Sequence, residues 1–456
     1  MNDAAEMPLS EPGASQMQPA GPDASPMRLL QPDVSQMRPT WCDIDLGALE
    51  RNLAAIRRHV GEAEVVPVVK ANAYGHGIAH VGLALAAAGV SCMAVAYVEE
   101  ALALRSVGVT VDIHVLGGAV ERQIPLFLAH NLILTAPSID KLRQIDEAAQ
   151  AAGTTARAHL KIDTGMERIG VHHYNADKLF AESLRCRSVR VEGVFSHFAN
   201  ADAPDLSHAR AQLDRFNEAV NFYERHSLPT PVRHMSASAA IARLPEAHLD
   251  SVRPGILLYG VAPKPEIAAA LPTEPVLSWH SEVVYFKVVP EGASVGYGST
   301  WTADRQTRVI TLPVGYADGY ARSLGTGPAH DPAQGPTSVL IDGARHHVVG
   351  NVCMDQTMVD IGDASAYNGD RVTLIGSHGD ERVTVIDLAD WSGRSPYEVL
   401  TGISLRVPRV HRSEAEPLGE AVARAAREPV SHGNREQERE APVDAVNGGG
   451  ESGAGH

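Results

Sequence analysis

Five polar side chains of complementary kinds follow apolar runs in the first half of the chain: Lys70, Arg168, His197, Ser238 and Arg253. Taken singly, each has an ordinary explanation. A lysine stem can be buried while its ammonium reaches solvent, a histidine can be satisfied in a core, an arginine can be solvated on a loop, and a serine can cap a helix. Lysine is nevertheless rarely buried without a partner. If the ends of these runs share one rim, the five side chains form a site.

The chemistry that needs this set is that of pyridoxal 5'-phosphate (PLP). A lysine at such a rim can form an imine with an aldehyde cofactor. Around Ser238, "HMSASAA" offers hydroxyl and backbone N–H groups to a phosphate, and "PGI" adds the amides of Gly255 and Ile256. A charged Arg253 beside the pyridine nitrogen would keep that nitrogen unprotonated. It would then withdraw fewer electrons, which favours simple proton exchange over wider side reactions.

Strands that alternate with helices must position these residues. Runs typical of buried strands recur eight times, at 65–69, 92–97, 112–117, 132–136, 156–163, 189–198, 232–236 and 250–260. Helical patterns separate them; Asp45, for example, can cap a helix whose buried face is formed by Leu46, Leu49, Leu53, Ile56 and Val60. The alternation predicts an α/β fold with a (β/α)8 TIM-type barrel, whose strand ends face the active-site mouth. An open doubly wound sheet would need a G-x-G-x-x-G turn after its first strand, and none stands there.

The domain organisation changes near residue 272, where strands broken by Gly, Asn and Asp turns replace the alternation. We therefore expect a PLP-binding barrel at 38–271 and a separate all-β domain at 272–411, to which 38–45 contributes a strand. Residues 7–37 carry a ten-residue repeat of Met, Pro and Ser without apolar residues to bury. This tail (1–37) and the Glu-, Arg- and Gly-rich tail at 412–456 are expected to be disordered.

Composition limits the partners and the compartment. The 456 residues carry a net charge of −16, which gives a nucleic-acid partner little support. No apolar run approaches the ~20 residues needed to span a bilayer, and no secretory signal is visible. The four cysteines have no spacing typical of a metal site or a disulfide framework: Cys42, Cys92, Cys186 and Cys353. We expect a cytoplasmic protein without a metal or a membrane partner.

From residue 38 to about 411 the sequence resembles the alanine racemase family. "VVKANAYGHG" resembles the family's cofactor-lysine signature, which implies Lys70 as the imine lysine and Tyr74 near the cofactor. "LKIDTGMERIG" resembles the segment whose lysine, here Lys161, is carbamylated in many members and orients Arg168. "SHFANAD" implies that His197 supports the pyridine-facing arginine, which is Arg253 in "VRPGILLYG".

The resemblance continues in the second domain. "SVGYGSTW" matches the motif of a second catalytic base, Tyr297, "LPVGYADGY" that of a substrate-access tyrosine, Tyr316, and "GNVCMDQTMVDIG" the segment whose Met354 amide holds the substrate carboxylate. The resemblance implies a PLP-dependent racemase that interconverts L- and D-alanine by two bases, Lys70 and Tyr297, and supplies D-alanine for peptidoglycan. It further implies a homodimer in which the facing β-domain belongs to the second subunit.

Two departures concern the phosphate. Ala237 stands where many members carry an asparagine, although Ser238 and Ser236 remain, and Leu405 stands where some have a phosphate-binding tyrosine. The retained Lys161 favours a narrow alanine substrate, since broad-specificity relatives tend to lack it. Two other functions stay open. A decarboxylase of the same fold would pair the pyridine nitrogen with a carboxylate instead of Arg253, and a non-catalytic PLP-carrying protein would have a single barrel without Tyr297.

Overall fold

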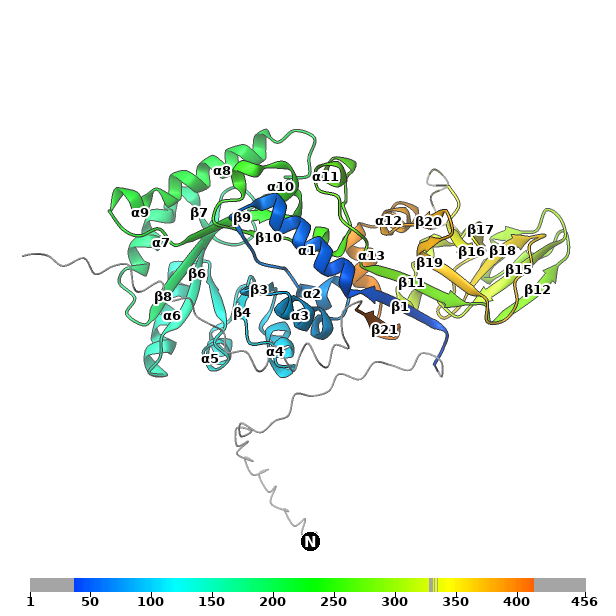
Figure 1. The fold of residues 1–456 in the computed structure, drawn as a ribbon, viewed down its shortest axis with the longest axis horizontal. Helices are drawn as coiled ribbons and strands as arrows, with labels where there is room; N and C mark the ends of the chain where they lie inside the picture. Colours follow the sequence, from blue (N-terminus) through cyan, green and yellow to red (C-terminus); the bar gives the residue numbers. More distant parts are fainter. Residues whose placement is uncertain (1–36, 328–330, 332, 334, 414–456) are drawn as a thin grey trace, which may run out of the picture.

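The computed structural model describes residues 37–327, 331, 333 and 335–413. These residues form two bodies, a barrel-like N-terminal one and a β-rich C-terminal one, joined into an elongated molecule (Figure 1). The tails predicted to be disordered lie outside the described residues, apart from residues 37, 412 and 413. None of the described helices combines the length and the apolar character needed to cross a bilayer.

Eight parallel strands form the barrel, as predicted. Their order around it is β2-β10-β9-β8-β6-β5-β4-β3. Their bounds are β2 (Glu64–Val65), β3 (Cys92–Val95), β4 (Asp112–Val115), β5 (Ile133–Ala136), β6 (Ala156–Asp163), β8 (Val189–Phe195), β9 (Val232–Ala237) and β10 (Ser251–Arg253). A parallel bridge between Val68 and Ala94 joins the two edges of the sheet. The first strand is shorter than the predicted 65–69 because Pro67 has no N–H to donate to the ladder, and only its carbonyl pairs, with the Ala94 N–H at 2.8 Å.

Helices cover the outside of the barrel. The longer ones are α1 (Leu46–Val60), α3 (Ile78–Ala87), α4 (Val98–Ser106), α6 (Ile139–Ala151), α7 (Ala176–Ser183) and α8 (Ser207–Val220). Short helices complete the ring: α5 (Ile124–Ala129), α9 (Phe222–Arg225), α10 (Ser238–Arg243) and α11 (Pro265–Ala270). The prediction for α1 is confirmed, because Asp45 accepts a hydrogen bond from the Ala48 N–H and the predicted apolar face is buried.

The C-terminal body is built on one sheet in the order β12-β15-β18-β17-β16-β19-β11-β1-β21. These strands are β1 (Thr40–Asp45), β11 (Leu277–Glu282), β12 (Tyr285–Val289), β15 (Thr307–Leu312), β16 (Ser338–Ile341), β17 (Ala344–Val349), β18 (Thr357–Gly362), β19 (Arg371–His378) and β21 (Arg409–Arg412). Three short strands flank it: β13 (Ser294–Val295), β14 (Trp301–Thr302) and β20 (Glu381–Val383). The segment before the barrel thus joins this sheet as β1, while the exact domain limits at 271 and 272 remain predictions.

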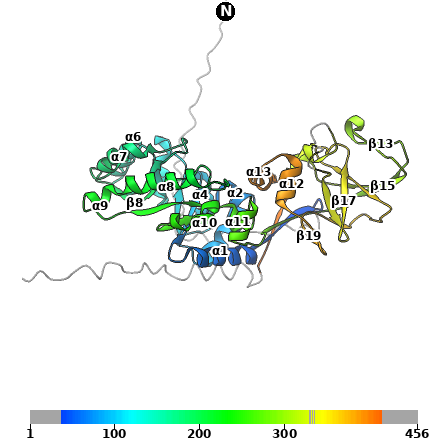
Figure 2. The ribbon, with the colours of Figure 1, turned by 90° about the horizontal axis from the view of Figure 1, so that it is seen from above.

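Two helices of the C-terminal body were not predicted. They are α12 (Val385–Ser392) and α13 (Pro396–Gly402), and both begin with a capping box, in which Thr384 and Ser395 accept hydrogen bonds from the Asp387 and Glu398 N–H groups. Seen from above, α12 and α13 lie between the barrel and the large sheet (Figure 2). Strand β21 also contacts the barrel, since Arg409 Nε donates to the Gly75 carbonyl at 2.9 Å.

Candidate active site

Lys70 opens a left-handed turn. The four residues after it, Ala71–Tyr74, have φ angles of 53°, 56°, 54° and 51°. Such a conformation costs an L-residue roughly 1–2 kcal/mol, so side-chain contacts must hold it. The Glu100 carboxylate accepts the Ala71 N–H at 2.5 Å and the Ala96 N–H at 2.8 Å, and Asn72 Oδ1 accepts the Ile78 N–H at 2.8 Å. The turn therefore fixes the backbone that carries Lys70 at the end of the first strand.

A cavity of about 790 Å³ opens at this end of the barrel. We call it the barrel-mouth cavity, and its volume is in the range of small-molecule and cofactor sites. It is lined by the barrel residues that the sequence singled out, with the exception of Ser236: Lys70, Tyr74, Lys161, Arg168, His197, Ser238, Arg253, Gly255 and Ile256. The strand ends therefore bring these side chains together, although their individual roles remain predictions.

The predicted phosphate-binding corner lies between α10 and β10. Ser238 Oγ accepts the N–H groups of Gly255 at 3.0 Å and Leu257 at 3.2 Å. A Cβ atom on Gly255 would lie 2.4 Å from Tyr74 Oη, so only glycine leaves room for that hydroxyl. The expectation for Ser236 is wrong, since its hydroxyl is buried and donates to the Ala247 carbonyl at 2.6 Å.

Leu405 does not substitute for a phosphate-binding tyrosine, because its side chain is 84% exposed and does not line the cavity. The aromatic residue of the C-terminal body that does line it is Tyr397 of α13, whose ring centroid lies 6.3 Å from that of Tyr74. The sequence analysis missed Tyr397. The Ser395–Glu398 capping box, which predicts a helix at this point, was the signal that could have drawn attention to it.

Arg253 is buried and held on three sides. Its Nη2 donates to the carbonyls of Ser196 at 2.9 Å and Met235 at 3.0 Å, and its Nη1 donates to His234 Nδ1. Burial lowers the pKa of Arg253 to about 9, so the guanidinium stays cationic at neutral pH. The sequence analysis predicted that His197 supports Arg253. In the structure the histidine bonded to Arg253 is instead His234, which the sequence analysis did not single out.

Lys161 and Arg168 both belong to the wall of the barrel-mouth cavity. Lys161 is buried, and its Nζ lies 4.4 Å from the centroid of the Phe195 ring. The loop that carries Arg168 is held by Asp163, whose carboxylate accepts four backbone N–H groups at 2.8–3.2 Å. Burial raises the pKa of Asp163, but these hydrogen bonds outweigh it and keep the pKa below its ordinary value.

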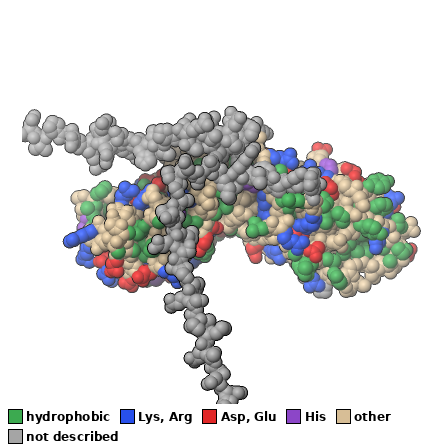
Figure 3. Space-filling model, turned by 90° about the horizontal axis from the view of Figure 1, so that it is seen from below, with side chains coloured by type: hydrophobic (Ala, Val, Ile, Leu, Met, Phe, Trp, Pro, Cys, Tyr) green, Lys and Arg blue, Asp and Glu red, His purple; other side chains and the backbone are tan. Residues whose placement is uncertain are grey.

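Tyr297, Tyr316 and Met354 lie elsewhere. They line a second cavity of about 770 Å³ on the C-terminal body, which we call the C-terminal cavity. Their exposed fractions are 75%, 43% and 53%, and hydrophobic side chains are visible on the surface of this body (Figure 3). Within one chain the predicted residues therefore form two groups, one on each body, and Tyr297 does not reach the cavity of Lys70.

A buried carboxylate holds the Tyr316 turn in place. Asp318 is fully buried and accepts two hydrogen bonds from Arg38, both at 2.8 Å, and one from the Gly315 N–H at 3.0 Å. Arg406 lies 3.3 Å from the same carboxylate and 2.8 Å from Asp355, the neighbour of Met354. The turn that carries Tyr316 and the loop that carries Met354 thus share one arginine.

Replacing Asp318 with alanine is expected to lower the free energy of unfolding by about 2–3 kcal/mol, because the buried carboxylate accepts hydrogen bonds from the Arg38 guanidinium and from the buried Gly315 N–H, and its loss leaves that N–H without this acceptor. Urea unfolding followed by tryptophan fluorescence measures this. The matched control is Asp355→Ala, which removes an exposed partner of Arg406 and should change stability little. Equal effects of the two substitutions would contradict the assignment of Asp318 as the anchor.

Comparison with known proteins covers both bodies. The models "Alanine racemase, N-terminal domain" and "Alanine racemase, C-terminal domain" match residues 44–263 and 276–411. The alanine racemase of Carboxydothermus hydrogenoformans is 39% identical over 375 residues, 82% of this chain and 99% of that protein. The structure of the Clostridium difficile 630 alanine racemase has a TM-score of 0.76 at 33% identity and covers 83% of this chain and 97% of that one. That of Bartonella henselae alanine racemase with covalently bound pyridoxal phosphate has a TM-score of 0.73 at 28% identity, covering 82% and 99%.

Proposed function

The chain belongs to the alanine racemase family, and from this premise we propose that it interconverts L-alanine and D-alanine with PLP held in the barrel-mouth cavity. The observation that carries the proposal is the convergence of Lys70, Arg168 and Arg253 in that cavity. Chiral chromatography after incubation of the PLP-loaded protein with L-alanine should reveal D-alanine. Release of CO2 would instead indicate a decarboxylase, and an unchanged substrate a non-catalytic PLP carrier.

The residues of the cavity fit PLP. Gly255 leaves space where a side chain would meet Tyr74, and Ser238, whose Oγ accepts the Gly255 and Leu257 N–H groups, has its own O–H to donate to a phosphate. Lys70 would hold the cofactor covalently, and Arg253 would face its pyridine nitrogen. Tyr74, His197 and Ile256 would complete its surroundings. When bound, PLP withdraws electrons from the substrate α-carbon and makes its hydrogen acidic.

Lys70 is suited to accept that hydrogen as a proton. Burial lowers the pKa of its amine and the nearby Arg168 lowers it further, while Glu100 opposes the change. A larger fraction of the amine is then neutral near physiological pH. Racemisation must also deliver or remove a proton on the opposite face of the α-carbon, and we assign that face to Tyr297.

The second base must come from another chain, because Tyr297 lies in the C-terminal cavity of its own chain, away from Lys70. We therefore include in the proposal a head-to-tail two-fold homodimer that sets each C-terminal cavity against the partner's barrel mouth. In this arrangement Arg168 and the backbone N–H of the partner subunit's Met354 would bind the substrate carboxylate. The partner subunit's Tyr316 would narrow the access route.

Carbamylation of Lys161 is a further part of the proposal. Burial lowers the pKa of this amine well below its ordinary value, and Arg253 and Arg168 add to the effect. A neutral amine can attack CO2: an N–C bond forms, one proton leaves to solvent, and the product is an anion. That anion could accept hydrogen bonds from Arg168, which an ammonium would repel.

Lys161→Ala should therefore lower kcat/KM about 10–100-fold, the equivalent of one charge-assisted hydrogen bond, and added acetate should restore part of it. The wild-type protein equilibrated with ¹³C-bicarbonate should give a carbamate NMR signal that the variant lacks. The control is Lys287→Ala, since that lysine is exposed on β12. The proposed role would be refuted if Lys161 of the wild-type protein gave no carbamate signal and acetate did not restore activity to Lys161→Ala.

We place the enzyme in the cytoplasm, as a source of D-alanine for peptidoglycan. The support is chemical: all four cysteines are unpaired, as expected in a reducing compartment.

A further inference from the structure

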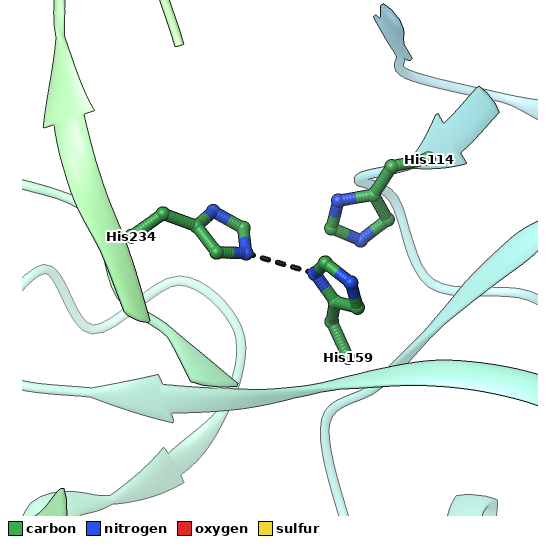
Figure 4. Close-up of side chains that lie close together, drawn as sticks. All are labelled: His114, His159 and His234. Atoms are coloured by element: carbon green, nitrogen blue, oxygen red, sulfur yellow. Dashed lines mark hydrogen bonds between the residues drawn. The ribbon is translucent and has the colours of Figure 1, made fainter. Parts of the chain in front are cut away.

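Three histidines lie together inside the barrel, and the chemistry proposed above uses none of them. They are His114 of β4, His159 of β6 and His234 of β9, and one ring nitrogen of each lies within 4.8 Å of the others (Figure 4). His114 and His234 are 1% and 3% exposed. We call the three residues the histidine cluster. Such a group could bind a metal ion or could form a hydrogen-bonded chain, and the donors and acceptors around it discriminate between these two functions.

The hydrogen bond from Arg253 determines which ring nitrogen of His234 carries the proton. A guanidinium has only donors, and it meets His234 at Nδ1, so this nitrogen must accept. The neutral His234 ring then carries its proton on Nε2. That nitrogen lies 2.8 Å from His159 Nδ1 and donates to it, as the dashed line in Figure 4 indicates. His159 in turn must carry its proton on Nε2.

A second set of bonds fixes His114. The hydroxyl of Thr135 has one proton, which it donates to the Val115 carbonyl at 2.8 Å. It therefore accepts from His114 Nε2 at 3.1 Å, and His114 also carries its proton on Nε2. Burial, with Arg253 as the next cause, lowers the pKa of His159 to about 3. Burial likewise lowers the pKa of the other two, so all three rings are neutral at physiological pH.

Two residues of β8 pack against the rings of His159 and His234. A Cβ atom on Gly193 would lie 2.6 Å from His159 Nδ1, so the ring of His159 occupies the space that glycine leaves. The ring of Phe195 stacks on that of His234 with an interplanar angle of 3° and a centroid distance of 4.9 Å. Both imidazoles are thus held in place by packing as well as by hydrogen bonds.

We propose that the histidine cluster holds Arg253 in one orientation at the barrel-mouth cavity through a neutral hydrogen-bonded relay of His234 and His159, with His159 as a positioning residue that acts through His234. His114 packs against the ring of His159 and is not itself a link of the relay. The inference rests on the proposed function, in which Arg253 faces the cofactor. A divalent metal is disfavoured because it would break the bond between His159 and His234 and would add positive charge beside a buried guanidinium. The cluster itself contains no carboxylate to offset that charge.

Two substitutions of His159 separate positioning from general stability. The amide oxygen of His159→Asn can accept from His234 Nε2 roughly where Nδ1 does, whereas His159→Leu removes the acceptor. Both should lower the melting temperature through lost packing. Only His159→Leu should lower kcat, by about 10–100-fold with KM nearly unchanged, as is typical when a partner of a site residue is lost. Equal kcat values in the two variants would overturn the proposal.

Two readouts do not need racemase activity. In ¹⁵N-histidine-labelled holoprotein, signals assigned through His114, His159 and His234 variants should all report the Nε2–H form, and a different tautomer at His234 or His159 would overturn the relay. Holoprotein incubated with Zn²⁺ and then desalted should retain no zinc that depends on these residues. One equivalent of zinc, lost in His114→Ala, would replace the relay by a metal centre. If the wild type fails to racemise alanine while the tautomers are as expected, the proposed function fails and the relay stands.

Discussion

Tyr297→Phe is expected to abolish exchange of the α-hydrogen of L-alanine with solvent while leaving that of D-alanine nearly intact. Racemisation removes a proton from one face of the α-carbon and returns one to the other, and the proposed mechanism places one base on each side. In that mechanism Lys70 would serve D-alanine and the partner subunit's Tyr297 would serve L-alanine. Loss of a general base typically costs about 10²–10⁴-fold in rate.

Proton NMR in D2O measures the exchange on each enantiomer separately. Net racemisation should be lost in both directions, and a Lys70 variant supplied with a small amine should show the reverse bias, with exchange retained on L-alanine. Tyr285→Phe is the matched control, because Tyr285 is an exposed tyrosine of the same body. Equal loss of exchange from both enantiomers in Tyr297→Phe would point to one base acting on both faces.

Mixing two inactive variants should restore activity. In a dimer with shared sites, Lys70→Ala and Tyr297→Phe each damage both sites when paired with themselves. A hybrid dimer has one site with both defects and one site with neither. Random exchange makes half of the dimers hybrid, so about a quarter of the wild-type activity should return. The expected gain over either inactive variant is of the same order as the loss of a general base, about 10²–10⁴-fold.

Subunit exchange must be proven independently, by tagging the two variants differently and isolating doubly tagged dimers. The control mixture is Lys70→Ala with the double variant Lys70→Ala, Tyr297→Phe, which can form no intact site. Purified hybrids without activity would refute the shared site. Full activity in a wild-type protein shown to be monomeric would do the same.

The barrel could be predicted because mostly apolar strands alternate with helices and end in polar residues, a pattern that few other folds produce. The turn after Lys70 could not be predicted. Alanine and asparagine have no preference for four successive left-handed residues, and "KANAY" is typical of an ordinary helix. The conformation depends on contacts from elsewhere, above all with Glu100. The two helices α12 and α13 had visible capping boxes at Thr384 and Ser395, which the strand-rich surroundings obscured.

The members of the barrel-mouth cavity followed from strand ends, because all ends of parallel barrel strands meet on one rim. The hydrogen-bond partners of these residues could not be predicted in the same way. Whether Arg253 bonds to His197 or His234 depends on which side of a strand each ring occupies, and both histidines stand near strand ends. The separation of Tyr297 from Lys70 could be expected only through the resemblance to a family, because a quaternary arrangement leaves no local pattern in the sequence.

The left-handed turn at Ala71–Tyr74 also bears on how this enzyme could be redesigned. Four residues at roughly 1–2 kcal/mol each store several kcal/mol, against a typical net stability of about 5–15 kcal/mol. A β-branched residue at position 71 or 73 would add to the strain. Glycine would relieve it, but glycine would also give the backbone beside Lys70 more conformations to adopt. Attempts to alter the substrate range therefore have more freedom around Tyr316 and Met354, where the residues other than glycine have ordinary backbone angles, than in the segment that holds the lysine.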